Sequence, residues 1–171
     1  MSPDKLTDEE EEMRDMLTGL PDRSMFMDIL RQTVERGELH GNCCAVVLVT
    51  LDGLPEVNLR NGRSAGDAVL RSAADSLRGC ISERDMVARV AGNAFALILS
   101  GVHRRADIQR VVADLRAALS LGVMDDDLYL PIQASLGVDV YPDGGKDPAG
   151  LLARAGRGAT GGAAAVRAMR H

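Results

Sequence analysis

The feature that most constrains the fold is a run of apolar residues, rich in Val, that extends from Cys43 to Leu51. Apolar residues that do not alternate with polar ones are typical of a central strand buried on both faces. At 171 residues the chain has room for one domain. Aromatic residues make up 2% of the chain, whereas 46% of it is apolar. The core around this strand must therefore be built from Val, Leu, Ile, Ala and Met.

Helical and strand patterns alternate along the rest of the chain. Phe26, Ile29, Leu30 and Val34 recur at helical spacing, and Gly37 is expected to close that helix. The further expected elements are, in order, a polar and Gly-rich stretch from 52 to 66, a helix with Val69, Leu70, Ala73 and Leu77 on one side, a hairpin of strands Met86–Val90 and Phe95–Ser100, a helix over about 104–121, and one or two strands within 128–141. This order predicts an α/β (α+β) sandwich in which helices surround one central mixed or antiparallel sheet.

The two ends of the chain are harder to interpret. Thr7 and the acidic run to Glu12 predict a helix start, because carboxylates in a first turn suit the helix dipole; an acidic docking arm is the alternative. A small apolar group follows, which either packs on the domain's own core or forms an exposed docking stripe: Met13, Met16 and Leu17. The tail from 147 to 171 should be a last helix, frayed or interrupted by glycines that each cost roughly 1 kcal/mol relative to Ala: Gly156, Gly158, Gly161 and Gly162.

Charge and cysteine usage exclude several classes of protein. The net charge is −5 and the basic residues are scattered, so binding to nucleic acid phosphates is not expected. Cys43, Cys44 and Cys80 lack metal-ligand spacing, which indicates reduced structural thiols. No stretch approaches the apolar length of about 18 residues that a membrane span requires, and the N-terminus is acidic, so neither a span nor a signal peptide is expected. We therefore expect a cytoplasmic protein.

Four segments occur in an order and spacing that is specific as a set. They are Asp15–Arg23 (DMLTGLPDR); Leu51-Asp52 with Asn58, Gly62 and Gly66–Leu70; Arg89–Ala96 (RVAGNAFA); and Ala134–Val138 (ASLGV). Together they resemble the GGDEF (diguanylate cyclase) domain family over roughly Asp15 to the C-terminus, with Ala91-Gly92-Asn93-Ala94-Phe95 in place of the signature. The resemblance implies a nucleotide-cyclase-like palm fold. Residues 1–14 would then be an acidic helical lead-in, and residues 15–171 a degenerate GGDEF domain.

The resemblance also implies a chemistry. Members of the family condense two GTP molecules, one on each of two facing domains, into cyclic di-GMP with metal ions that neutralise the triphosphate and activate the attacking hydroxyl. Mg²⁺ prefers hard oxygen ligands such as carboxylates. The family's metal-ligand positions correspond to Thr50 and Asn93, and a further acidic signature position to Ala94, so no catalytic residue and no metal site are expected. Asp52 is the carboxylate placed to rescue a metal site, and capping of the following turn is its other interpretation.

The nucleotide contacts that the resemblance implies are only partly present. At the first signature position, Ala91 leaves less room than Gly for a phosphate to approach the backbone closely. Pro55, which has no N–H donor, stands where the family usually has Lys. Arg167 is the remaining candidate for phosphate binding. Asn58 and Asp67 match the residues that bind guanine, whose two adjacent N–H donors suit a carboxylate. Alternatively, Asp67 opens the following helix and Asn58 is a loop residue.

A product-inhibition motif of the family corresponds to residues 82–85. Asp85 is present, but Ser82 replaces the Arg of the motif. Feedback binding of cyclic di-GMP at this place is therefore not expected.

These observations predict a catalytically inactive GGDEF-domain protein that acts as a regulatory or protein-interaction module in cyclic di-GMP signalling. The expected partner, supplied in trans, is another protein of that signalling system, either a cyclase, a phosphodiesterase or a sensor kinase; homodimerisation stays open. Two alternatives are a receptor for GTP or cyclic di-GMP through Asn58 and Asp67, and a weak diguanylate cyclase that uses Asp52. No cofactor is expected, and Mg²⁺ would bind only if GTP binding remains.

Overall fold

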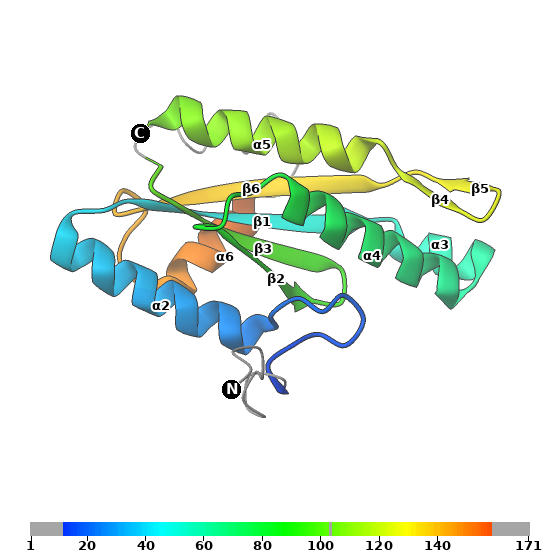
Figure 1. The fold of residues 1–171 in the computed structure, drawn as a ribbon, viewed down its shortest axis with the longest axis horizontal. Coiled ribbons are helices and arrows are strands. Elements are labelled where there is room, and N and C mark those ends of the chain that lie inside the picture. The colour runs from blue at the N-terminus through cyan, green and yellow to red at the C-terminus, as the bar shows by residue number, and fades with distance from the viewer. Residues whose placement is uncertain (1–11, 103, 159–171) are drawn as a thin grey trace, which may run out of the picture.

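The computed structural model describes residues 12–102 and 104–158, which form a sheet with helices on both faces (Figure 1). The helices are α2 (Arg23–His40), α3 (Leu54–Asn61), α4 (Arg63–Gly79), α5 (Arg105–Ser120) and α6 (Pro148–Gly158). The strands are β1 (Cys44–Asp52), β2 (Met86–Ala91), β3 (Ala94–Ser100), β4 (Val123–Asp125), β5 (Leu128–Leu130) and β6 (Gln133–Tyr141).

The main sheet has the strand order β2-β3-β1-β6, and every neighbouring pair in it is antiparallel. Strand β1 lies inside the sheet, where Val47 pairs with Leu97 of β3 on one side and with Val138 of β6 on the other. The predicted sandwich is confirmed, and the sheet is antiparallel rather than mixed. The predicted hairpin is β2–β3, and the helix expected over about 104–121 is α5.

Both faces of β1 are covered, as its apolar run predicts. Val47, Val49 and Leu51 face the side of α4 and α5, while Cys44 and Val46 face the side of α2 and α6. Figure 1 shows α5 above the sheet and α2 below it. The helices contribute Val69, Leu70, Leu77, Val112 and Leu115 to the first cluster, and Phe26, Leu30, Val34, Leu151 and Ala155 to the second. The core is thus almost entirely aliphatic.

Helix α2 does not end at Gly37, so that expectation is wrong. The helix continues to His40 and ends at Gly41, whose left-handed conformation (φ 71°) closes it. Gly37 is buried inside the helix, where a Cβ would lie 2.6 Å from the Tyr141 ring and 2.8 Å from the Asn42 carbonyl oxygen. The glycine therefore serves close packing rather than helix termination.

The stretch from 52 to 66, expected to be polar and irregular, contains helix α3 and the start of α4. Gly53 (φ 75°) and Gly62 (φ 88°) bound α3, so these glycines mark its two ends rather than a loop. Pro55 lies in the first turn of α3, where no backbone N–H is needed. Strand β4 was also not expected, because three residues are too few to show an alternating pattern.

The segments at the two ends are only partly described. The acidic helix start at Thr7 and the glycines at 161 and 162 lie outside the described residues. Of the small apolar group, Leu17 packs against the main core, Met13 is half-buried and Met16 is fully exposed. The core-packing alternative therefore holds for Leu17 but not for Met16.

The cysteines are free thiols, as expected. Cys44 is buried, and burial raises the pKa of its thiol to about 11. Across residues 12–102 and 104–158, none of the helices has both the length and the apolar character that crossing a membrane would take.

The substitution Gly37→Ala should lower the free energy of unfolding by about 1–3 kcal/mol, because the added methyl group would overlap the Tyr141 ring and the Asn42 carbonyl. Urea unfolding followed by circular dichroism measures the change. Gly79→Ala, at the exposed end of α4, is the matched control: a Cβ there meets no atom within 4 Å, so stability should stay the same or rise by up to about 1 kcal/mol. Equal stabilities of the two variants would contradict this account of Gly37.

Candidate functional site

The end of β1 brings several of the predicted site residues to one edge of the sheet. Thr50 is paired with Ala94 at the start of β3 and with Ser135 on β6. Asp52 ends the strand two residues later, so its side chain lies on the same face as that of Thr50. Asn93 occupies the tip of the β2–β3 hairpin beside this edge.

The carboxylate of Asp52 is engaged across the sheet. Oγ of Ser135 donates a hydrogen bond to Oδ2 of Asp52 at 2.8 Å. The N-cap of α3 is Gly53, and this helix start has no side-chain cap. The interpretation of Asp52 as a cap for the following turn is therefore wrong, and its carboxylate instead links β1 to β6.

Asn93 holds the hairpin tip to β1 through both its backbone and its side chain. The Leu51 amide donates to the Asn93 carbonyl oxygen at 2.8 Å. In return, Nδ2 of Asn93 donates to the Leu51 carbonyl oxygen at 3.2 Å. A carboxylate has no N–H and could not make the second bond, so this contact requires the amide.

These residues offer few of the hard oxygen ligands that Mg²⁺ prefers. Thr50 offers a neutral hydroxyl, the Asn93 amide is turned to the Leu51 carbonyl, and Ala94 offers no ligand at all. Beside a triphosphate, Mg²⁺ is usually bound through one or two carboxylates in addition to the phosphate oxygens. Asp52 supplies one carboxylate, and within the described part of the chain no three His, Cys, Asp or Glu residues are grouped so that they could hold a metal ion.

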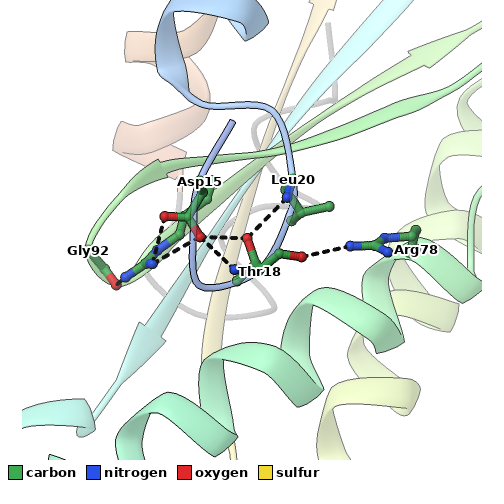
Figure 2. A network of polar contacts seen from close by, with 6 residues as sticks. Asp15, Thr18, Leu20, Arg78 and Gly92 are labelled. Atoms are coloured by element: carbon green, nitrogen blue, oxygen red, sulfur yellow. Dashed lines mark hydrogen bonds and ion pairs between the residues drawn. The ribbon is translucent and has the colours of Figure 1, made fainter. Parts of the chain in front are cut away.

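The turn that precedes α2 is organised by the carboxylate of Asp15 (Figure 2). Thr18 donates twice to its Oδ2, from the amide at 2.9 Å and from the hydroxyl at 2.7 Å. The backbone closes the same turn, because Gly19 donates to the Asp15 carbonyl at 2.8 Å and Asp15 donates to the Leu20 carbonyl at 2.7 Å. Nη1 of Arg89 lies 3.0 Å from Oδ1 and 3.1 Å from Oδ2 of Asp15.

Arg89 connects this turn to the signature hairpin. Its Nη2 donates to the Gly92 carbonyl at 2.8 Å, and its backbone N–H donates to the Pro21 carbonyl at 2.9 Å. From the other side, Nη2 of Arg78 on α4 donates to the Thr18 carbonyl at 3.1 Å (Figure 2). The opening turn, α4 and the hairpin tip are thus held by one network of hydrogen bonds.

The network also sets the pKa of Asp15. Burial alone would raise this pKa, but the hydrogen bonds from Thr18 and the charge and hydrogen bonds of Arg89 outweigh it, and the pKa is lowered. The Asp15 and Arg89 side chains are only 21% and 16% exposed, so water screens the ion pair weakly. The ionised carboxylate is therefore more stable in the folded protein than in the unfolded chain.

This network is not predicted by the sequence, although Asp15 and Arg89 both lie in the segments that resemble the GGDEF family. A local signal exists for one part: Asp followed three residues later by Thr, then Gly and Pro, is typical of a turn closed by a side chain. No pattern in the sequence indicates that Arg89 pairs with Asp15, because the two residues are 74 positions apart.

The two guanine-binding candidates lie on neighbouring helices. A Cβ at Gly66 would overlap Oδ1 of Asn58, so this glycine leaves the space that the Asn58 amide occupies. Asp67 follows Gly66 directly. It lies in the second turn of α4, which begins at Arg63, so the expectation that Asp67 opens the helix is wrong. Asn58 is likewise a helix residue, exposed on α3, and not a loop residue.

Of the remaining candidate residues, Asp85 is described by the structure and Arg167 is not. Asp85 accepts hydrogen bonds from the amide and hydroxyl of Ser82, both at 3.0 Å on Oδ2, and from the Ser100 amide at 3.0 Å on Oδ1. Both oxygens of Asp85 thus hold the turn before β2 to the end of β3. The phosphate-binding candidate Arg167 lies outside the described residues.

The protein is an α+β domain with a four-stranded antiparallel sheet and helices on both faces. Its candidate site lies at the end of strand β1, inside the sheet. The family model described as "Diguanylate cyclase, GGDEF domain" matches residues 12–160. The chain therefore belongs to the GGDEF domain family, as its sequence predicts.

Individual relatives agree with this assignment. The chain is 32% identical over 139 residues to diguanylate cyclase TpbB of Pseudomonas aeruginosa, an alignment that covers 81% of this chain and 32% of TpbB. It thus spans about a third of that relative's length. A sensory box/GGDEF family protein from Caulobacter crescentus superposes with a TM-score of 0.81 at 31% identity, covering 86% of this chain and 95% of that one. Diguanylate cyclase SiaD of P. aeruginosa, solved in complex with its activator SiaC, superposes with a TM-score of 0.80 at 29% identity, covering 94% and 58%.

The substitution Asp15→Asn should lower the free energy of unfolding at neutral pH by about 2 kcal/mol, because it removes the charge that Arg89 and Thr18 stabilise. Since the pKa of Asp15 is lower in the folded state, its contribution is complete above the ordinary value of 3.8 and is lost as the pH falls through the lowered value. Urea unfolding at stepped pH should show a constant difference between wild type and variant near neutral pH and a shrinking one below 3.8.

Asp28→Asn is the control for this prediction, because Asp28 pairs with Arg31 at 3.3 Å on the exposed surface of α2. Its effect should stay below about 0.5 kcal/mol. A difference for Asp15→Asn that does not change with pH would contradict the role given to its carboxylate.

Proposed function

We propose that this chain is a catalytically silent GGDEF domain that acts as a regulatory or protein-interaction module in cyclic di-GMP signalling. The observation that carries the proposal is the contact of Asn93. At the hairpin position where the family's chemistry needs an acidic metal ligand, the side chain is an amide that donates to the Leu51 carbonyl. The residue is thus part of the hydrogen bonding that holds the hairpin to β1.

The rest of the edge supports the same proposal. Thr50 is neutral, and the carboxylate of Asp52 already accepts a hydrogen bond from Ser135. The metal ions that neutralise a triphosphate would have to be held by this one carboxylate, whereas metal-assisted phosphoryl transfer depends on several hard oxygen ligands. The Asp15–Arg89 network, by contrast, holds the hairpin frame in place. On this proposal the domain has the hydrogen bonds that hold the hairpin in place but lacks the carboxylates that the family's chemistry needs.

A silent domain in this signalling system would act through contact with another protein. SiaD shows that a protein with this fold can be held in a complex with a protein activator. We propose a partner of the same signalling system in the cytoplasm, either an active cyclase, a phosphodiesterase or a sensor kinase.

The proposal predicts that purified protein incubated with GTP and Mg²⁺ or Mn²⁺ makes no cyclic di-GMP above a blank without protein, because the edge lacks the carboxylates that hold the metal ions. Product is measured by chromatography coupled to mass spectrometry. The GGDEF domain of TpbB, assayed in parallel, is the positive control.

Formation of cyclic di-GMP by the wild type would contradict the proposal, and Asp52→Asn would then show how it arises. Product that disappears in Asp52→Asn would establish the rescued cyclase, in which Asp52 holds the metal ion alone. Ser135→Ala is the matched variant, because it frees the Asp52 carboxylate from its hydrogen bond without changing its charge.

A second candidate function is a nucleotide receptor, and the packing of Asn58 against Gly66 favours it. This packing places the exposed Asn58 amide against Gly66, the residue next to Asp67 on α4. A carboxylate accepts hydrogen bonds from the two adjacent N–H donors of guanine in a bidentate way, which adenine cannot offer. The receptor would bind GTP or cyclic di-GMP by the base alone.

The receptor function predicts calorimetric binding of GTP that is unchanged by removal of Mg²⁺, absent for ATP, and lost in Asp67→Ala. Asp75→Ala, on the exposed surface of the same helix, should bind like the wild type. Absence of a binding signal for both GTP and cyclic di-GMP at about 1 mM, an affinity worth only about 4 kcal/mol, would remove this candidate.

A further inference from the structure

The β4–β5 ribbon stands apart from the main sheet. It is a separate two-stranded sheet that follows α5, and Figure 1 shows it extending beyond the end of that helix. Val123 and Leu130 are paired across the ribbon and pack against the main core cluster. The ribbon is therefore fixed to the domain by one face, and the side chains of alternate residues point the other way.

The outer face of the ribbon carries two large exposed apolar side chains, and a third lies at the adjoining end of α5. Met124 and Tyr129 are directly paired across the two strands and are 62% and 52% exposed, and Leu121 at the adjoining end of α5 is 77% exposed. Tyr129 is held in place, because its ring lies against the backbone of Gly122, where a Cβ would be 2.6 Å from the hydroxyl. Exposed apolar groups that gather in this way mark interaction sites, whereas single ones do not.

Leu128 of β5 is 45% exposed as well, whereas the remaining exposed large apolar side chains in the described part of the chain are scattered. Met16 lies in the turn before α2, Leu39 near the end of α2, and Leu59 on α3. Each of them is the single strongly exposed large apolar residue of its segment. Met and Tyr are also among the residue types enriched in the buried centres of protein interfaces. Within the described residues, the ribbon is thus the place where exposed large apolar side chains lie close to one another in the structure.

The charges at the tip of the ribbon select the occupant. Asp126 and Asp127 form the turn between the two strands, Asp125 ends β4 on the face of Val123, and the ion pairs within the described residues use other carboxylates. Nucleic acids and anionic lipid surfaces would be repelled by this tip. A second copy would bring another acidic tip into the same two-fold interface, where like charges oppose association. A cationic partner is complementary to it.

We propose that the outer face of the β4–β5 ribbon, made by Leu121, Met124 and Tyr129, docks a segment of another protein in which apolar side chains are flanked by Lys or Arg. The apolar side chains of that segment cover Met124 and Tyr129, and its cations lie against Asp126 and Asp127. This inference rests on the proposed function, because it names the surface through which a silent domain contacts its partner.

The test uses the full chain and a defined probe, a fluorescein-labelled amphipathic peptide of Leu and Lys. A peptide in which Glu replaces each Lys is the control with reversed charge. Fluorescence anisotropy should show saturable binding of the Lys peptide and none of the Glu peptide. Met124→Ser/Tyr129→Ser should weaken binding by about tenfold or more, while Leu59→Ser should bind like the wild type. If the double variant unfolds, Leu121→Ser removes an apolar group outside the strand pair and should also weaken binding.

The charged tip is tested by Asp126→Asn/Asp127→Asn. Asn tolerates the left-handed conformation of Asp126 (φ 52°), so the turn is retained. This variant should bind the Lys peptide more weakly than the wild type at low salt and should lose most of the salt dependence. No binding of the Lys peptide, equal binding by all variants, or self-association that Tyr129→Ser abolishes would each overturn the inference.

A comparison of pull-downs separates this inference from the proposed function. A cyclic di-GMP enzyme recovered from native lysate by the wild type and equally by Met124→Ser/Tyr129→Ser would overturn the ribbon contact and leave the proposed function standing. Recovery by the wild type alone would support both. Cyclic di-GMP synthesis by this chain, together with intact peptide binding, would overturn the proposed function and leave the ribbon contact standing.

Discussion

The burial of β1 on both faces is the constraint on which the rest of the structure depends. Val47 and Val49 face α4 and α5, and Cys44 and Val46 face α2 and α6, so neither helical layer can be removed without exposing a strand that has almost no polar side chains. Strand β1 is also paired on both edges, with β3 and β6. Its free end at Asp52 is therefore the place where side chains from several elements meet without forming part of the core.

Much of this architecture could be predicted from local patterns, and the errors have physical causes. The long strands and helices show their period over enough residues to be recognised. Helix α3 does not, because its eight residues are bounded by Gly53 and Gly62 and contain Pro55, which are loop signals unless their places at the helix ends are known. The packing role of Gly37 could not be predicted for a different reason. Its role depends on Tyr141, which contacts it from a strand far along the chain.

The same limit applies to the candidate site. The resemblance to the GGDEF family located Thr50, Asn93 and Asp52, and the structure brings them to one edge. What their side chains do could not be predicted, because Asn93–Leu51 and Ser135–Asp52 are contacts set by the registry of strands distant in sequence. The Asp15–Arg89 pair is of the same kind. Residue identity indicates which side chains stand at these positions, whereas the fold shows which contacts they make.

The hydrogen bond from Asn93 to the Leu51 carbonyl has an evolutionary consequence. An aspartate in its place would put a carboxylate oxygen where an N–H now meets a carbonyl, and two acceptors would face each other with no metal ion to separate them. Thr50 would have to change as well before a cation could relieve that repulsion. The change of Asn93 to aspartate is therefore unfavourable by itself, and the order in which the residues of this edge change determines which of them are tolerated.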